Sequence, residues 1–161
     1  MRRSSWHLWL VGSASLAFLA FLALPAAGGS AAPLRNSAGG TISITDRQVS
    51  LKRIDQGPRG ASAGDLEIVW QALYNKRIKP QAIGHAQLIC TMLTLQSRNC
   101  SATYFLPKGK LVVEGVIGSR LLYEIPVTGG TGIYVGARGS LLVTRASEHP
   151  QREILQFRLV S

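Results

Sequence analysis

Short apolar runs at a regular spacing are the feature that most constrains the fold of this chain. After residue 40 they recur at intervals of about 8–12 residues and are separated by turn residues, a pattern typical of all-β sandwiches and barrels. Neither a helix longer than one turn nor an internal repeat is expected there. The strands number eight or nine, depending on whether Asp46 only bends one long first strand, and they span 41–46, 48–55, 65–74, 82–94, 101–106, 110–118, 121–127, 139–146 and 153–160.

A glycine-rich stretch, Val127–Ser140, lies between two apolar runs and contains five glycines. Glycine tolerates positive φ and lets a second backbone approach closely. A phosphate-binding loop needs Lys followed by Ser or Thr at the start of a helix, and a dinucleotide fingerprint needs a helix after its last glycine. This stretch leads instead into Leu141–Thr144, which is strand-like. It therefore predicts a strand–turn–strand corner and not a nucleotide site.

Alternation along the strands separates two faces. One face of the strand at 65–74 is apolar and includes Trp70, whereas the other face carries Glu67 and Gln71. Some strands, such as Leu111–Ile117, are apolar on both faces. Because a barrel strand has one face inward and one outward, an outer apolar face needs a cover. Self-association is the predicted cover, and packing under a loop of the same chain is the alternative.

The N-terminus has the layout of a secretory signal peptide. A positive start, Met1–Arg3, precedes the apolar segment Leu8–Leu24 and a run of small residues that ends at Ala32. Export with cleavage of this leader is the prediction, and an uncleaved membrane anchor is the alternative because the apolar run approaches spanning length. The expected organisation is a signal peptide at 1–32, a flexible linker at 33–40 and a single β-domain at 41–161.

The chain is strongly basic. Without Arg2 and Arg3, its 18 Lys and Arg become 16 against 8 Asp and Glu, so residues 33–161 carry a net charge of +8. An exported protein with this charge is attracted to anionic surfaces, which makes an acidic cell-surface polymer or a membrane surface a candidate partner. A solvated basic exterior with no such partner is the alternative. The basic residues are scattered and lack a recognition motif, so no nucleic-acid partner is predicted.

The C-terminal half of the chain resembles two plant protein families. The order of Thr103–Phe105, Lys108–Lys110, Val113–Gly115, Thr128–Tyr134 and Gly136–Gly139 is similar to that in allene oxide cyclases and in dirigent proteins. This resemblance implies an eight-stranded antiparallel closed β-barrel of calycin-like shape with a central cavity. It also implies a homo-oligomer, a trimer or a dimer, and a small hydrophobic molecule as the ligand.

The resemblance to the cyclases concerns four residues. Cys90 matches a cysteine beside the cyclase cavity, and Gln71 falls near a pocket asparagine. Ser43 and Thr45 stand where the cyclases carry a glutamate and an asparagine on their first strand. These two replacements distinguish the chain from a plant-type allene oxide cyclase.

The resemblance to dirigent proteins concerns another pair. Arg138 matches the arginine of their Ala-Arg-Gly segment, Asp46 matches an aspartate at the end of their first strand, and Ile133 replaces a second aspartate. Asp46 and Arg138 are expected either to pair at the cavity rim or to face solvent. The aromatic residues expected to line the cavity, with core packing as the alternative, are Trp70, Tyr104, Tyr123 and Tyr134.

Cys90 and Cys100 are the only cysteines, and export makes an oxidising compartment the expected one. A disulfide between them is predicted, and two free thiols or one reactive thiol are the alternatives. A turn centred on Arg98 would place Cys90 opposite residue 105 or 106. The bond therefore requires a bulge or a wider loop that begins near Leu93.

The residue chemistry leaves three functions open. After the leader, only His85 and His149 remain as histidines, so neither a metal site nor a cofactor is expected. The first function is a barrel that binds a small hydrophobic molecule and guides its cyclisation or coupling by confinement. The second is a true isomerase or cyclase that uses Asp46, Arg138 or Cys90. The third is a non-catalytic basic module of the cell surface, which a barrel with a filled interior would favour.

Overall fold

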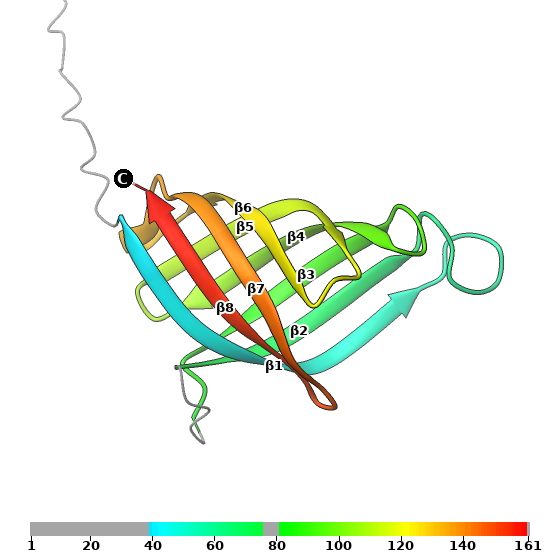
Figure 1. Cartoon of the computed structure of the whole chain (residues 1–161), viewed down its shortest axis with the longest axis horizontal. Coiled ribbons are helices and arrows are strands. Elements are labelled where there is room, and N and C mark those ends of the chain that lie inside the picture. Colours follow the sequence, from blue (N-terminus) through cyan, green and yellow to red (C-terminus); the bar gives the residue numbers. More distant parts are fainter. Residues whose placement is uncertain (1–38, 76–80, 161) are drawn as a thin grey trace, which may run out of the picture. The chain divides into compact units, whose positions relative to one another are not determined.

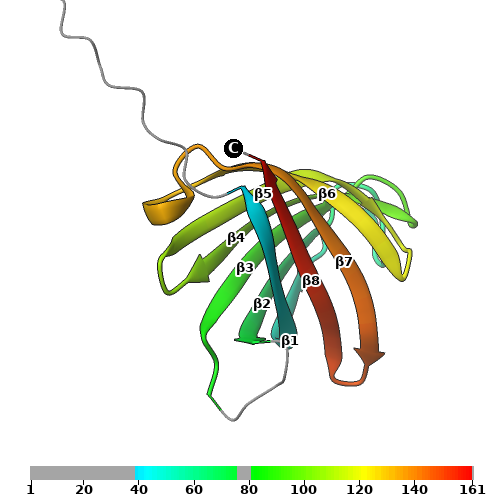
Figure 2. The ribbon, with the colours of Figure 1, turned by 60° about the vertical axis from the view of Figure 1, so that its left-hand side comes forward.

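The computed structural model describes residues 39–75 and 81–160, which form a closed barrel (Figure 1). Each strand is antiparallel to its neighbours in the chain, and β8 closes the barrel between β7 and β1 (Figure 2). The predicted eight-stranded antiparallel β-barrel is confirmed. The elements are β1 (Gly40–Ile54), β2 (Leu66–Asn75), β3 (Gly84–Met92), β4 (Ser97–Leu106), β5 (Gly109–Gly118), β6 (Leu122–Gly130), the 3₁₀ helix η1 (Gly132–Tyr134), β7 (Arg138–Glu148) and β8 (Gln151–Val160).

The expected signal peptide at 1–32 and most of the expected linker at 33–40 lie outside the described residues. Export, cleavage of the leader and the alternative of a membrane anchor therefore stay predictions. Within the described residues, no helix has the length and apolar character needed to cross a membrane.

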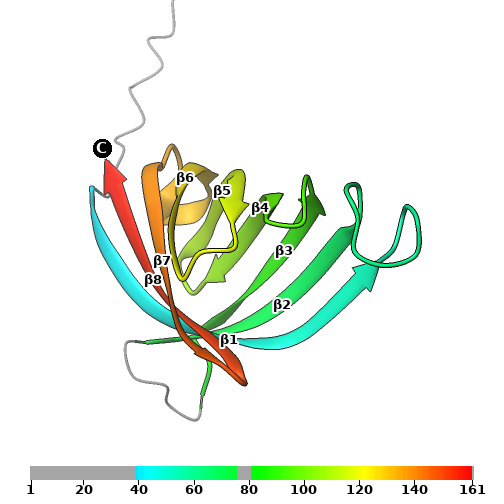
Figure 3. The same cartoon turned by 45° about the vertical axis from the view of Figure 1, so that its right-hand side comes forward.

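β1 is one long strand, not two. Its first part, Gly40–Thr45, pairs with β8, and its longer part, Ile44–Ile54, pairs with β2. The register with β2 shifts between Gln48 and Ser50, as in a β-bulge. Beyond β8 the strand continues along β2 (Figure 3). Asp46 therefore follows directly on the last β1 residue that pairs with β8.

Apolar side chains fill one end of the barrel interior. Those with no exposed surface include Leu73, Leu111, Leu141, Leu155 and Phe157, which come from β2, β5, β7 and β8. Burial of each such side chain contributes about 1.5–3 kcal/mol. Leu155, Phe157 and Leu159 share the inward face of β8.

The two faces of β2 point the opposite way from the expectation. Glu67 and Gln71 are buried inside the barrel, whereas Trp70 is on the outer face and 43% exposed. The placement of Trp70 in the cavity is therefore corrected. Period-two alternation separates two faces of a strand but does not tell which is inside when the interior contains polar groups.

The glycine-rich stretch forms the predicted corner between β6 and β7. Gly132 adopts φ +65°, in the left-handed region, and a Cβ atom there would collide with the backbone oxygen of Lys108. A Cβ atom on Gly109 would likewise collide with the backbone oxygen of Thr131. The β4–β5 turn and the β6–β7 corner thus lie in backbone contact that only glycine permits.

Cys90 and Cys100 form the predicted disulfide and are direct partners in the β3–β4 ladder. The turn centred on Arg98 is wrong, because β3 ends at Met92 and β4 already begins at Ser97. The wider loop beginning near Leu93 is the correct alternative. A bond that closes this short loop stabilises the barrel by roughly 2–3 kcal/mol.

The outer face of β2–β5 carries exposed apolar side chains. Ile89 and Val116 are 55% and 61% exposed. On the same face the rings of Trp70, His85 and Phe105 stack in a row, with centroids 5.9 Å and 4.4 Å apart. The second apolar face expected from the sequence is thus present, and its cover by self-association stays a prediction.

Candidate functional site

The other end of the barrel interior is hollow. A cavity of ≈ 230 Å³, here called the mouth cavity, has walls from all eight strands. It lies at the end where β1 connects to β2, β3 to β4, β5 to β6 and β7 to β8. Its apolar wall consists of Leu51, Val69, Leu88 and Ile117, and its polar wall consists of Gln48, Arg53, Glu67, Gln71, Arg98, Tyr123, Arg145, Gln151 and Glu153.

Asp46 and Glu153 are two buried carboxyl groups at the base of this cavity. Asp46 has no exposed surface, and its Oδ1 accepts a hydrogen bond of 2.8 Å from the backbone N–H of Glu153. Burial, and then the negative charge of Glu153, raise the pKa of Asp46 to about 8. Asp46 therefore carries a proton at neutral pH. Glu153 is on the cavity wall, whereas Asp46 lies behind it.

Glu153 is held by polar groups of three strands. Gln151 Nε2 donates to its Oε1 at 3.1 Å, and Gln71 Nε2 donates to its Oε2 at 3.5 Å. The Arg145 guanidinium is 3.9 Å away, at the outer limit of an ion pair. Glu153 is only 5% exposed, and these contacts offset the cost of burying its carboxylate.

Several polar atoms around this pair are buried without a hydrogen-bond partner in the described part of the chain. They are Asp46 Oδ2, Gln71 Oε1 and Arg145 Nε. Leaving a buried polar group unpaired costs about 1–3 kcal/mol, so such groups are rare in folded proteins. Gln71 and Arg145 line the cavity, so their unpaired atoms are available to a polar group of a ligand or to water.

Two tyrosines complete the base of the cavity. Tyr123 is on the wall, and Tyr104 is buried beneath it, edge-on to Phe157 with ring centroids 5.1 Å apart. Burial, together with the nearby carboxyl groups, raises the pKa of Tyr123 and of Tyr104 above the ordinary value for a phenol. Both remain protonated at physiological pH, so they act as hydrogen-bond donors and not as bases.

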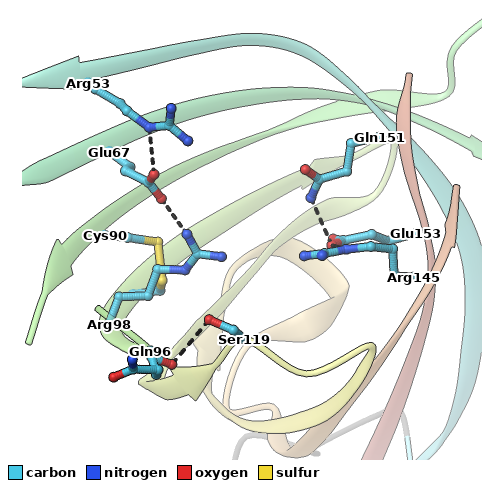
Figure 4. Close-up of polar contacts among 10 residues, drawn as sticks. Arg53, Glu67, Cys90, Gln96, Arg98, Ser119, Arg145, Gln151 and Glu153 are labelled. Atoms are coloured by element: carbon cyan, nitrogen blue, oxygen red, sulfur yellow. Dashed lines mark hydrogen bonds and ion pairs between the residues drawn. A yellow bond between two sulfur atoms is a disulfide. The ribbon is translucent and has the colours of Figure 1, made fainter. Parts of the chain in front are cut away.

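An ion-pair row crosses the cavity wall from β1 to β4 (Figure 4). The Glu67 carboxylate accepts from Arg53 Nε at 3.0 Å and from Arg98 Nη1 at 2.5 Å. Glu67 is 8% exposed, so two guanidinium groups compensate one buried carboxylate. Glu67 is also the ladder partner of Cys90, which places the disulfide in the wall beside this row.

The structure brings together part of the site expected from the sequence. Gln71 and Tyr123 line the mouth cavity, and Cys90 is in its wall. Asp46 and Tyr104 lie directly behind that wall. Because Cys90 is bonded to Cys100, it offers no free thiol, and a nucleophilic role for it is not supported.

Other expected residues lie elsewhere. Ser43 and Thr45 alternate with the buried Ile44 and so are on the outer face of β1, where the Thr45 hydroxyl donates to the backbone oxygen of Asn75. Arg138 is exposed and donates to the backbone oxygens of Thr128 and Ala137. These three residues do not line the mouth cavity.

Tyr134 and the expected Asp46–Arg138 pair are also corrected. Tyr134 is buried in η1, in the corner between β6 and β7, and is not part of the cavity wall. No ion pair joins Asp46 to Arg138 among residues 39–75 and 81–160. Asp46 is paired with the backbone of Glu153 instead.

Five charged residues of the site were not anticipated: Arg53, Glu67, Arg98, Arg145 and Glu153. The sequence contained a signal for two of them. Glu153 lies two residues before the inward Leu155, and Arg145 lies two residues after the inward Val143. Continuing the period-two pattern past the last apolar residue would have placed both side chains inside the barrel.

The described residues contain no group of three His, Cys, Asp or Glu side chains arranged to hold a metal ion. The mouth cavity itself offers carboxyl groups, amides and a phenol for chemistry. A neutral carboxyl group beside an ionised one provides a proton donor and a proton acceptor in the same place.

The chain has similar solved structures but no match among protein-family models or curated proteins. No protein-family model and no curated protein matches the chain. Among solved structures, a pyocyanin demethylase matches with a TM-score of 0.64 at 20% identity, covering 75% of this chain and 100% of that one. A pterocarpan synthase dirigent protein matches with a TM-score of 0.58 at 16% identity, covering 76% and 96%.

A third match extends the comparison to cyclases. The Diels–Alderase of Streptomyces koyangensis has a TM-score of 0.57 at 15% identity, and the match covers 77% of this chain and 70% of that one. Identities this low show the fold alone. The chain therefore shares its barrel fold with dirigent proteins and a Diels–Alderase, and its resemblance to the allene oxide cyclases stays a prediction.

Proposed function

We propose that the barrel binds a small, mainly hydrophobic molecule in the mouth cavity and promotes its cyclisation or isomerisation. The observation that carries this proposal is the protonated Asp46 beside Glu153, beneath a cavity in which polar atoms are left unpaired. The cavity also argues against the filled barrel expected of a purely structural module, since Trp70 and Phe105 are not among its lining residues.

Confinement of the ligand in the cavity is the first contribution to the rate of cyclisation or isomerisation. The apolar wall of Leu51, Val69, Leu88 and Ile117 holds the body of the ligand and excludes water. Holding reacting atoms in a near-attack geometry removes an entropic barrier of up to about 7–11 kcal/mol in favourable cases. A flexible chain fixed in one folded conformation thus closes its ring faster and with one stereochemistry. The dirigent and Diels–Alderase neighbours support guided coupling or cyclisation as the reaction class.

Proton transfer is the second contribution. Asp46 holds one proton, and the Glu153 carboxylate faces the cavity. The proton of Asp46 passes through the Glu153 carboxylate to one atom of the ligand, which leaves Asp46 ionised. The ligand then loses a proton from another atom to Glu153, and this proton returns to Asp46, so that no proton is consumed overall. Tyr123 donates a hydrogen bond to a developing oxyanion.

The cellular setting is part of the same proposal. The disulfide supports an oxidising compartment, and with the leader at 1–32 it favours export of the protein. The exposed apolar face of β2–β5 supports a homo-oligomer, and the net charge of +8 on residues 33–161 supports attachment to an anionic cell-surface polymer or membrane surface. An uncleaved leader would keep the same barrel at a membrane.

The test starts from small molecules that copurify with the protein from its native host, identified by mass spectrometry. The conversion of each to an isomer is then measured with the wild-type protein, with Asp46→Asn and with Glu153→Gln. We expect both variants to retain binding and to lose at least about 10²-fold in rate, the usual contribution of a general acid. Glu114→Gln, at an exposed position on β5, is the matched control and should convert normally.

Two results would contradict parts of this proposal. Unchanged conversion by Asp46→Asn and Glu153→Gln would leave confinement as the whole effect and remove the proton step. The absence of any copurifying molecule, combined with failure of the mouth cavity to bind an apolar dye, would exclude the ligand-binding function.

A further inference from the structure

A second hollow lies next to the mouth cavity. This groove of ≈ 520 Å³ is beneath the β1–β2 loop, and Ile54, Ala61, Leu66 and Met92 form its apolar surface. The Arg53–Glu67–Arg98 row lines both hollows. The row is therefore a partition, with the carboxyl pair on one side and an apolar groove on the other.

The groove has a fixed wall. In the β1–β2 loop, the Asp65 carboxylate accepts from the backbone N–H groups of Gln56 at 3.0 Å and of Ser62 at 2.8 Å. The Asp55 carboxylate accepts from the N–H groups of Gly57 at 3.3 Å and of Gly60 at 3.1 Å. Both carboxylates shape the loop, and their negative charge makes the groove unfavourable for an anionic group. The groove suits an uncharged, apolar part of a ligand.

The mouth cavity has the opposite electrostatic character. Three arginines, Arg53, Arg98 and Arg145, line it against two glutamates, Glu67 and Glu153, which leaves one positive charge in excess. The neutral state of Asp46 behind the wall does not cancel this excess. A low-dielectric recess with an excess positive charge attracts an anion.

Two of the arginines retain free donors directed at the cavity. Arg98 engages Glu67 through Nη1, which leaves its other N–H groups for a ligand. Arg145 lies 3.9–4.0 Å from Glu153 and Glu148, and its Nε is buried without a hydrogen-bond partner in the described residues. Arg98 and Arg145 stand on opposite sides of the mouth cavity (Figure 4). An anionic group between them would receive hydrogen bonds from both.

We propose that the ligand is an amphipathic organic anion whose carboxylate, enolate or sulfonate is bound between Arg98 and Arg145, while its apolar part extends over the partition into the groove. This inference rests on the proposed function, because it names the class of molecule for the same cavity. It fixes the orientation of the ligand, since the charged end lies beside Glu153. Reaction is then expected at atoms next to the anionic group and not at the apolar end.

Two fluorescent probes with the same aromatic body test this proposal. The first is 8-anilinonaphthalene-1-sulfonate, and the second is N-phenyl-1-naphthylamine, which lacks the sulfonate. In fluorescence titrations of the purified protein we expect the sulfonate probe to bind about tenfold more tightly, the usual effect of hydrogen bonds to a charged group. Arg98→Gln and, independently, Arg145→Gln should remove most of that preference and leave the neutral probe unaffected.

Matched variants separate recognition from other effects. Arg158→Gln removes the same charge from the exposed outer face of β8, and the preference should survive. Met92→Gln, in the groove, should weaken both probes by the same factor. Equal binding of the two probes by the wild-type protein, or loss of the preference in Arg158→Gln as in Arg98→Gln, would overturn the anion proposal while the cavity remains a binding site. Failure of both probes to bind would overturn this proposal and the proposed ligand-binding function together.

Discussion

The two ends of the barrel interior are built by the same strands in the same alternation, yet their side chains differ in kind. Along β8, Glu153 is followed inward by Leu155 and Phe157, and along β2, Gln71 is followed by Leu73. The apolar end has native-like packing without exposed surface, whereas the mouth contains buried carboxyl groups and unpaired polar atoms. The apolar end therefore contributes most of the stability of the barrel. At the mouth, polar groups suited to chemistry replace side chains that would stabilise the fold.

The largest expected effect is a loss of stability when the packing of the apolar end is disrupted. Phe157→Ala removes a side chain with no exposed surface and should lower the free energy of unfolding by about 3–5 kcal/mol, measured by denaturant unfolding. At the mouth, Gln71→Leu should cost no more than about 1–2 kcal/mol, because the loss of the Nε2 donor to Glu153 is partly offset by removal of a buried oxygen without a partner in the described residues. Similar losses in the two variants would contradict the division of the interior into two ends.

The second expected effect is a dependence of stability on pH, which arises from Asp46 at the mouth and not from the apolar end. The pKa of Asp46 is raised to about 8 in the folded protein from an ordinary value of 3.8, so between these values the folded state binds a proton that the unfolded chain has released. The contribution of Asp46 to stability is therefore fully present below pH 3.8 and is lost as pH rises through about 8.

Asp46→Asn should remove this dependence, because asparagine keeps an acceptor for the Glu153 N–H and does not ionise. Above pH 8 the variant should be more stable than the wild type by about 1–3 kcal/mol, measured by unfolding at a series of pH values. Glu114→Gln, on the outer face, should follow the wild-type profile. A wild-type stability that stays constant between pH 5 and pH 8, as in Asp46→Asn, would show that Asp46 is already ionised in the folded protein across this range.

The smallest effect on folding concerns the outer face. Trp70→Ser changes a side chain that is 43% exposed and stacked on His85, so the free energy of unfolding should fall by only about 1 kcal/mol. The same variant should shift the protein toward the 17.3 kDa monomer in sedimentation equilibrium if β2–β5 is the self-association face. Identical sedimentation of wild type and variant would place the contact between copies elsewhere.

The sequence predicted the fold more fully than the site, for a physical reason. Strand spacing and turn residues are local signals. They predicted either eight strands, with one long first strand, or nine, and the structure has eight. Whether a face is inward depends on the whole barrel. Trp70 was expected to line the cavity, but Glu67 and Gln71 are inside, where Arg98 and Glu153 pair with them.

The position of the β3–β4 turn was missed for a related reason. Ser97 and Asn99 are typical turn residues, yet the tip is at Leu93–Gln96, where Leu95 is 62% exposed. The Thr94 hydroxyl accepts from the backbone N–H groups of Gln96 and Ser97 and so closes the tip without glycine. A turn closed by one threonine hydroxyl, without glycine, proline or asparagine, is difficult to recognise in a sequence.

The departure of β1 from β8 after Thr45 has a consequence for solubility. From Asp46 to Ile54 the strand pairs with β2 on one side, and within the described chain its other edge has no strand partner. Free edges invite pairing between copies and aggregation. Lys52 is exposed on this stretch, and a lysine at a sheet edge opposes such pairing. The extension of β1 past β8 therefore carries a charge that disfavours edge-to-edge association between copies of the barrel.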